Sequence, residues 1–151
     1  MTISIKAQRA NAPKFMSVDG STVFETDRVV LGAGQGGTPA ATNTIDFRIP
    51  AGAQVFDLAF QLDDCDTAAT FVFGVGFRPV NPASTLTRND TYFAPAGQTT
   101  GQAGGRLNCT FKPIQFEEDV FIHLLVGTAP TGISGNPEIH IIAGYNCRGA
   151  R

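Results

Sequence analysis

Apolar residues recur at every second position along several short segments of this chain. The clearest segment runs from residue 55 to residue 62, where an apolar set alternates with a more polar set. Because neighbouring side chains of a β-strand point to opposite faces, this period predicts a strand with one face in a core. The set expected inside is Phe56, Leu58, Phe60 and Leu62, and the set expected outside is Val55, Asp57, Ala59 and Gln61.

The same period of two residues predicts further strands in residues 45–49, 71–77, 106–111 and 139–144, and apolar runs predict strands in 28–31 and 120–126. In residues 71–77 the outward positions include Gly74 and Gly76, which leave room for another backbone or a partner to approach closely. No stretch of ten or more residues follows the 3.6-residue period of an amphipathic helix, so no helix is predicted. The further positions expected in the core are Ile45, Phe47, Ile49, Phe71, Phe73, Val75, Phe77, Leu107, Cys109, Phe111, Ile139, Ile141 and Ala143.

These segments predict an all-β fold of eight or nine strands. The 17 glycines and 9 prolines are spread along the chain, as turns between short strands require. Short strands with one apolar face are typical of an antiparallel β-sandwich, and eight strands in two sheets make the jelly roll that we expect. The region from 78 to 105 is expected to be a loop that holds a short strand at Tyr92 and Phe93. A chain of 151 residues has the length of one domain.

The N-terminal residues differ from the rest and predict an extended arm over residues 1–27, followed by the sandwich domain over residues 28–151. The apolar side chains of this arm are scattered and do not form one continuous face. A pair of ordinary strands at a sheet edge is an equally open alternative for the same residues. The apolar anchors expected in the arm are Phe15, Met16, Val23 and Phe24.

Composition narrows the classes of partner. The formal net charge is −2, so no basic excess favours binding to nucleic acid. No apolar run approaches the roughly 20 residues of a membrane span, and no secretory leader is recognised. The three cysteines, Cys65, Cys109 and Cys147, are an odd number without close pairing, which favours free thiols in a reducing compartment.

Three acids, Asp63, Asp64 and Asp66, stand between two predicted strands. Oxygen ligands so close together could bind calcium, but the residues after Asp66 supply neither the glycine nor the distal glutamate of a calcium-binding loop. Aspartate favours turns because its side chain accepts hydrogen bonds from the backbone two residues on. We therefore expect a turn here and no metal site.

No catalytic site is expected elsewhere in the chain. His123 and His140 lie in separate predicted strands, and two ligands fall short of the three or four that a metal usually takes, so each is expected to be a packed or edge residue. Cys65 follows two acids whose charge would raise the pKa of its thiol, which disfavours a nucleophilic thiolate. No Gly-x-Ser-x-Gly elbow is present. We therefore expect that the chain is not an enzyme and uses no cofactor.

The order of these features resembles the small head-decoration, or cement, proteins of tailed bacteriophages. Those chains begin with an extended N-terminal segment and a short strand, here residues 2–27 and 28–31. A turn of the form Leu/Ile-Pro-Ala-Gly-x-x-Val then leads into a long strand, as residues 49–55 do here. An acid-rich loop follows at residues 62–66, then a glycine-containing strand at residues 73–76, a long polar loop and two closing strands.

This resemblance, which covers most of the chain, implies a virion structural protein. Its expected role is to bind the outer surface of an icosahedral capsid and to cement neighbouring major capsid subunits. It also implies a homotrimer near three-fold positions on the capsid exterior, made in the bacterial host cytoplasm, with neither nucleic acid nor membrane as partner. The residues expected at the contact with the major capsid protein are Phe15, Met16, Val23 and Phe24.

Three alternatives stay open. A phage tail or fibre component shares the loose motifs of this family. A glycan-binding jelly-roll module would use exposed aromatic residues in a groove, for which Tyr92, Phe93 and Tyr145 are the candidates. A metal-dependent β-barrel enzyme would hold a bound metal ion.

Overall fold

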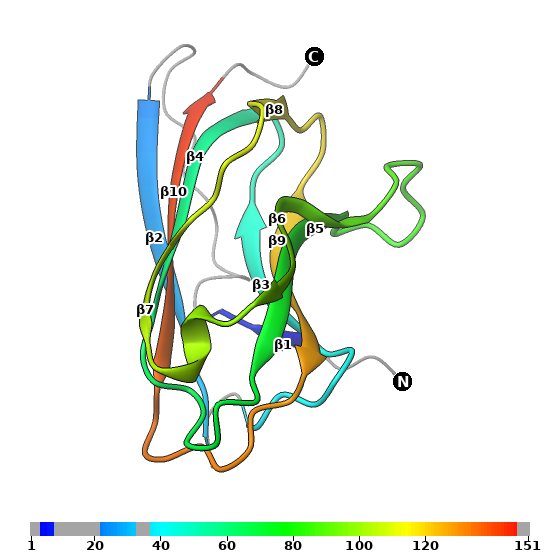
Figure 1. Cartoon of the computed structure of the whole chain (residues 1–151). Helices are drawn as coiled ribbons and strands as arrows, with labels where there is room; N and C mark the ends of the chain where they lie inside the picture. The colour runs from blue at the N-terminus through cyan, green and yellow to red at the C-terminus, as the bar shows by residue number, and fades with distance from the viewer. Residues whose placement is uncertain (1–3, 8–21, 33–36, 148–151) are drawn as a thin grey trace.

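The structure, a computed structural model, describes residues 4–7, 22–32 and 37–147. These residues form ten strands and one short 3-10 helix (Figure 1). No helix among them is long and apolar enough to cross a membrane. The elements are β1 (Ser4–Lys6), β2 (Thr22–Val30), β3 (Thr44–Ile49), β4 (Ala53–Leu62), β5 (Val72–Pro79), β6 (Asn89–Gln98), η1 (Thr100–Gln102), β7 (Gly105–Asn108), β8 (Ile114–Gln115), β9 (Val120–Thr128) and β10 (Glu138–Cys147).

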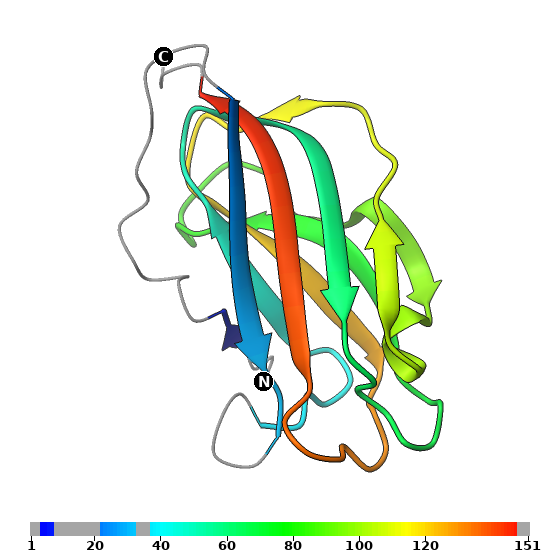
Figure 2. The ribbon, with the colours of Figure 1, turned by 90° about the vertical axis from the view of Figure 1, so that its left-hand side faces the viewer.

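The strands form two sheets packed face to face. Sheet A has the order β1-β3-β9-β5-β6, and sheet B has the order β2-β10-β4-β7, with β8 beside the start of β4. Figure 1 shows the two layers edge-on, and Figure 2 shows sheet B facing the viewer. Without β1 and β8, eight strands remain in two sheets of four. Lettered B to I in chain order, they run B-I-D-G and C-H-E-F, which is the jelly roll that the sequence predicted.

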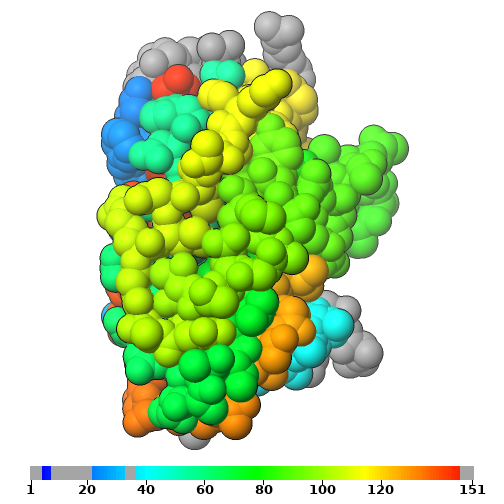
Figure 3. Space-filling view, in the orientation of Figure 1, coloured from blue at the N-terminus to red at the C-terminus, as the bar shows by residue number. Residues whose placement is uncertain are grey.

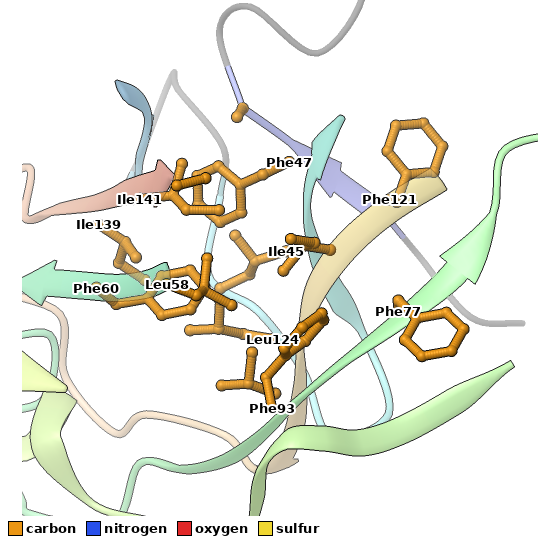
Figure 4. Close-up of a cluster of buried hydrophobic side chains, with 14 of the residues drawn as sticks. Ile45, Phe47, Leu58, Phe60, Phe77, Phe93, Phe121, Leu124, Ile139 and Ile141 are labelled. Atoms are coloured by element: carbon orange, nitrogen blue, oxygen red, sulfur yellow. The ribbon is translucent and has the colours of Figure 1, made fainter. Parts of the chain in front are cut away.

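The hydrophobic core fills the space between the sheets. Figure 4 shows Phe47 of β3 and Phe60 of β4 among the aliphatic side chains that meet there, and their ring centroids lie 5.8 Å apart. Each such side chain contributes roughly 1.5–3 kcal/mol when it is fully buried. The largest fully buried side chains are Tyr145, Phe47, Phe60, Phe71, Phe73, Phe93, Phe116, Leu31, Ile45, Leu58, Leu62 and Ile122.

A β-bulge in β4 overturns two predicted orientations. The pairing of β4 with β10 shifts register between Gly144 and Tyr145, whose partners are Asp57 and Val55. Phe56 is therefore an extra residue, and the inward–outward alternation reverses across it. The prediction was wrong for Val55, which is buried, and for Phe56, which is only partly buried, while Leu58, Phe60 and Leu62 point inward as predicted.

The N-terminal region contributes strands to both sheets. β1 pairs in parallel with β3 at the edge of sheet A, and β2 pairs with β10 at the edge of sheet B. The boundary predicted after residue 27 falls inside β2, which begins at Thr22. For the described residues, the structure therefore has the edge strands that were the alternative to an extended arm.

β6 is longer than the sequence predicted: a short strand was expected at Tyr92 and Phe93, and the structure has a strand of ten residues around them. Its pairing with β5 is irregular: Phe73, Val75 and Phe77 face Gln98, Ala94 and Asn89. The extra residues of β6 lie against the outer side of β5, and a Cβ atom on Gly76 would lie 2.0 Å from the carbonyl oxygen of Asn89. The close approach predicted at Gly76 is thus made by the chain's own backbone. Between β5 and β6 the chain projects from the body of the molecule (Figures 1 and 3).

Candidate interaction surface

The acid cluster after β4 forms a turn, as predicted. The carboxylate of Asp66 is 2% exposed and accepts hydrogen bonds from the backbone N–H groups of Ala68, Thr70, Phe71 and Thr131. Its distance to the nitrogen of Thr131, across the neighbouring loop, is 2.8 Å. Burial alone would raise the pKa of Asp66, but these donors hold it below its usual range.

The other two acids of the cluster also bind backbone. Asp64 accepts a hydrogen bond from the N–H of Asp66 at 3.1 Å, and Asp63 accepts one from the N–H of Glu138 at 2.8 Å. Throughout residues 4–7, 22–32 and 37–147, no three His, Cys, Asp or Glu side chains are grouped closely enough to hold a metal ion. The cluster joins the end of β4 to the loops before β5 and β10.

The cysteines with described side chains are free thiols with raised pKa values. Burial, followed by the charges of Asp63, Asp64 and Asp66, raises the pKa of Cys65 to about 12. Burial and the charge of Asp57 raise the pKa of Cys109 to about 12. Both thiols are thus protonated at neutral pH, which is the direction that the sequence predicted for Cys65.

The two histidines lie in different sheets and do not form a common site. His123 in β9 is fully buried, and its Nε2 lies 2.8 Å from Oδ1 of Asp90. His140 in β10 is half-buried on the outer face of sheet B, and its Nε2 lies 2.8 Å from Oε2 of Glu138. His123 is packed, as predicted, whereas His140 lies on the outer face of the interior strand β10 and is not an edge residue.

A buried polar network on the outer side of sheet A was not predicted. The carboxylate of Asp46 in β3 is fully buried and lies 2.6 Å from the guanidinium of Arg78 in β5. Asp46 is the cross-strand neighbour of both Lys6 and His123. The ammonium of Lys6 lies 3.9 Å from the ring centroid of Phe121. The alternation in residues 45–49 predicts that Asp46 points away from Ile45 and Phe47, as it does, but it contains no signal that β1 would pair with β3 and help to surround Asp46.

The four residues expected at a protein contact do not lie together on one described surface. Phe15 and Met16 lie outside the described residues. Val23 in β2 points inward and packs against the core. Phe24 is 64% exposed, and it is the one large hydrophobic side chain that the described residues leave open to solvent.

Phe24 belongs to the outer face of sheet B. Its ring packs edge-on against Phe56, with centroids 6.1 Å apart. Both rings lie over Gly144, where a Cβ atom would be 2.9 Å from Phe24 and 3.2 Å from Phe56. The bulge that turns Phe56 outward therefore creates an aromatic pair on this face, which alternation alone could not predict.

The described registers arrange the outer face of sheet B in rows across the strands. One row contains Arg28, His140, Gln61 and Arg106, and we call it the basic row. Glu138 lies beside it, 2.6 Å from Arg28 and 2.8 Å from His140, and the pKa of Glu138 is lowered mainly by its hydrogen bond to Arg28.

Two further rows lie next to the basic row. The middle row contains Thr26, Ile142, Ala59 and Asn108. The aromatic row contains Phe24, Gly144 and Asp57, with Phe56 beside them. The face therefore has a basic end, a centre in which Ile142 and Ala59 lie between Thr26 and Asn108, and an aromatic end that carries one acid.

The aromatic residues considered for a glycan site do not form an exposed platform. Phe93 and Tyr145 are each 1% exposed. Tyr92 is half-buried and packs against Phe77 and Phe93. These three side chains belong to the core or its margin.

No protein-family model and no curated protein matches this chain. Its fold matches a chain of the solved capsid of Ralstonia phage GP4 with a TM-score of 0.73 and 22% identity, over 98% of this chain and 99% of that one. A chain of the cyanophage Pam1 capsid asymmetric unit matches with a TM-score of 0.60 and 16% identity, over 89% and 91%. A chain of the acid-stable capsid of Helicobacter pylori bacteriophage KHP30 matches with a TM-score of 0.56 and 12% identity, over 87% and 92%. This chain thus shares its jelly-roll fold, over nearly the full length of each, with chains of three solved phage capsids.

Proposed function

We propose that this chain is a virion structural protein that binds the outer surface of an icosahedral phage capsid and cements neighbouring major capsid subunits. The observation that carries the proposal is the likeness to the chain of the Ralstonia phage GP4 capsid, which extends over 98% of one chain and 99% of the other. The likeness to chains of two further phage capsids supports the same role.

The molecule is suited to act through its surface. Both sheets enclose a core of packed aromatic and aliphatic side chains, and the polar groups of the acid cluster are engaged in a turn. In a capsid, many weak contacts act together, because neighbouring bound copies of the protein hold the same coat subunits. A small rigid sandwich can therefore stabilise a shell without a high affinity at any single site.

The finer features of the proposal come from the resemblance in the sequence. They are a homotrimer near three-fold positions on the capsid exterior, made in the bacterial host cytoplasm, with the major capsid protein as partner. Phe15 and Met16 are the proposed contacts with the coat, and Phe24 supports contact with another protein through its exposure. The proposal assigns no catalytic role and no cofactor to the chain.

Co-sedimentation with capsids tests the proposal. Purified protein is mixed with shells assembled from the major capsid protein of the same phage, and pelleted and free fractions are measured. We expect saturable pelleting of the unaltered protein and loss of pelleting for the double variant Phe15→Ala/Met16→Ala. Lys112→Ala, at an exposed position, is the matched control and is expected to pellet normally.

Two results would count against the proposal. Absence of pelleting at every concentration would exclude capsid binding. Recovery with purified tails and not with shells would assign the chain to the tail or its fibres. Normal pelleting of the double variant would leave the capsid role standing and exclude Phe15 and Met16 as the contact.

A further inference from the structure

The outer face of sheet B is complementary to itself. The middle row lies between the basic row and the aromatic row. A two-fold rotation about the middle row reverses the strand direction, so the basic row of one copy faces the aromatic row of the other. After such a rotation Arg28 of one copy faces Phe24 of the other, on the same strand β2. An arginine over an aromatic ring is a favourable cation–π pair. We propose that this face binds the same face of a second copy, about a two-fold axis that runs across the strands along the middle row.

Charge selects this axis over the other arrangement of two faces. With the axis across the strands, β7 of one copy faces β7 of the other. Arg106 at one end of β7 can then reach Asp57 on β4, the strand next to β7, of the other copy. With the axis parallel to the strands, Arg106 on β7 would instead face Arg28 on β2, and the carboxylate beside it, that of Glu138, is already bound to Arg28 and His140. Arg106 donates from Nε to the neutral side chain of Asn108 at 2.8 Å, and no ion pair involves it among the described residues. Its charge can therefore be neutralised by a carboxylate from a second copy.

The edge of sheet B is less suited to self-association than its face. A free edge strand can pair with the same strand of another copy, but charged residues that point inward from an edge strand disfavour such pairing. Glu25 and Asp27 of β2 are cross-strand neighbours of the buried residues Ala143 and Ile141, so they point inward. Glu25 accepts a hydrogen bond from the hydroxyl of Tyr145 at 2.9 Å. The carboxylates of β2 thus protect the edge and leave the face as the surface for a partner.

The area of the face is sufficient for a weak specific interface. Three strands about 4.8 Å apart each carry about five outward positions about 6.8 Å apart, and the short β7 adds two, which together outline roughly 500 Å² per copy. Two copies would bury roughly 1,000 Å², which is near the lower limit for a specific protein–protein interface. We therefore expect association that depends on concentration in the range of about 1 μM to 1 mM.

Light scattering of the full-length protein measures this association without any capsid, so its outcome is independent of the proposed function. We expect the molar mass to double as the concentration rises, whether the starting unit is a monomer or a trimer. Arg106→Asp should weaken the doubling about tenfold or more, because it places two acids together in each half of the interface. The double variant Asp57→Arg/Arg106→Asp exchanges the charges and should restore it.

Two further variants complete the test. Ile142→Glu places two carboxylates opposite each other on the axis and should abolish the doubling. Lys112→Asp makes the same kind of charge change at an exposed position outside the face and should leave the doubling unchanged. Circular dichroism confirms that each variant is folded. A constant mass for the unaltered protein, or equal association of Arg106→Asp and the double variant, would overturn the proposal.

Discussion

Single carboxylates fix the loops of this protein, and Asp66 is the clearest example. Its two oxygens accept backbone hydrogen bonds from the turn after β4 and from Thr131 in the loop before β10. The position of an acid cluster between two alternating strands was sufficient to predict the turn. The contact with Thr131 could not be predicted, because it joins residues 65 positions apart in the sequence.

Replacing Asp66 by asparagine should lower the thermal midpoint of unfolding at neutral pH. The amide keeps one acceptor oxygen, but its NH₂ group faces backbone donors. The pKa of Asp66 is lowered in the folded state, so its carboxylate stabilises the fold fully above the usual aspartate pKa of about 3.9, and this stabilisation is lost as the pH falls further. Thermal scans from neutral to acidic pH should show a smaller acid-dependent decrease for Asp66→Asn than for the unaltered protein. Parallel curves for the two proteins would contradict this account.

His123 should make the protein less stable in mild acid. Burial lowers the pKa of His123, although the nearby charges of Asp90 and Asp46 oppose this effect and Arg88 reinforces it. A histidine whose pKa is lowered by folding favours the folded state above its ordinary pKa of about 6.5, and this contribution decreases as the pH falls below that value.

Urea unfolding at about pH 7 and pH 5, on either side of that value, measures the effect. His123→Gln, which cannot titrate, should lose less stability between the two pH values than the unaltered protein does. His140→Gln, on the surface of sheet B, is the control and should behave like the unaltered protein. An equal loss in His123→Gln would show that other groups cause the acid sensitivity.

At the scale of the strands, regular alternation was predicted well and its interruptions were not. Residues 45–49 and 139–143 alternate without a break, and the structure places Ile45, Phe47, Ile139 and Ile141 inward as expected. Alternation fails at the bulge of β4, where the extra residue is set by pairing with β10, more than 80 positions away. The length of β6 was missed for a similar reason, because its irregular pairing follows the two glycines of β5 and not a pattern of its own.

Gly76→Ala should destabilise the protein by about 1–3 kcal/mol, the usual cost of overpacking a close contact. The new Cβ atom would lie 2.0 Å from the carbonyl oxygen of Asn89 and 2.5 Å from the Cα atom of Asp90, and both neighbours are backbone atoms. Chemical denaturation measures the change. Gly127→Ala is the matched control in β9, because its nearest neighbour would be 3.5 Å away, an ordinary contact. Similar losses for the two variants would show that the crowding at Gly76 is easily relieved.

At the scale of the whole molecule, the period of two residues and the spread of turns predicted the sandwich and its jelly-roll form. The strand order explains why: each sheet uses one face of its strands for the core, and the polar faces remain outside. The pairing of β1 with β3 and the row arrangement of the outer face of sheet B depend on contacts between distant segments. Such contacts leave no periodic trace in one sequence, so the candidate surface could be predicted only as far as the exposed Phe24.

Phe60→Ala should cost about 3–5 kcal/mol of folding free energy. Phe60 in β4 is fully buried, and its ring packs against Phe47 of the opposite sheet. Because the change removes a ring that both sheets contact, the loss should appear in the unfolding of the entire domain as one transition. Urea denaturation followed by circular dichroism measures it. A loss under about 1 kcal/mol would show that the two sheets repack around the missing ring.

The strand order also determines when this protein can fold during its synthesis. β9 and β10, the last two described strands in chain order, occupy interior positions in sheets A and B. Until β10 emerges, β2 and β4 have no strand between them, and until β9 emerges, β3 and β5 are likewise separated. Before these two strands are made, β5 can pair with β6 and β4 with β7, but neither sheet is continuous until β9 and β10 fill its interior. We therefore expect fragments that end before Glu138 to aggregate, because the edges of β2 and β4 that β10 would cover stay unpaired in them.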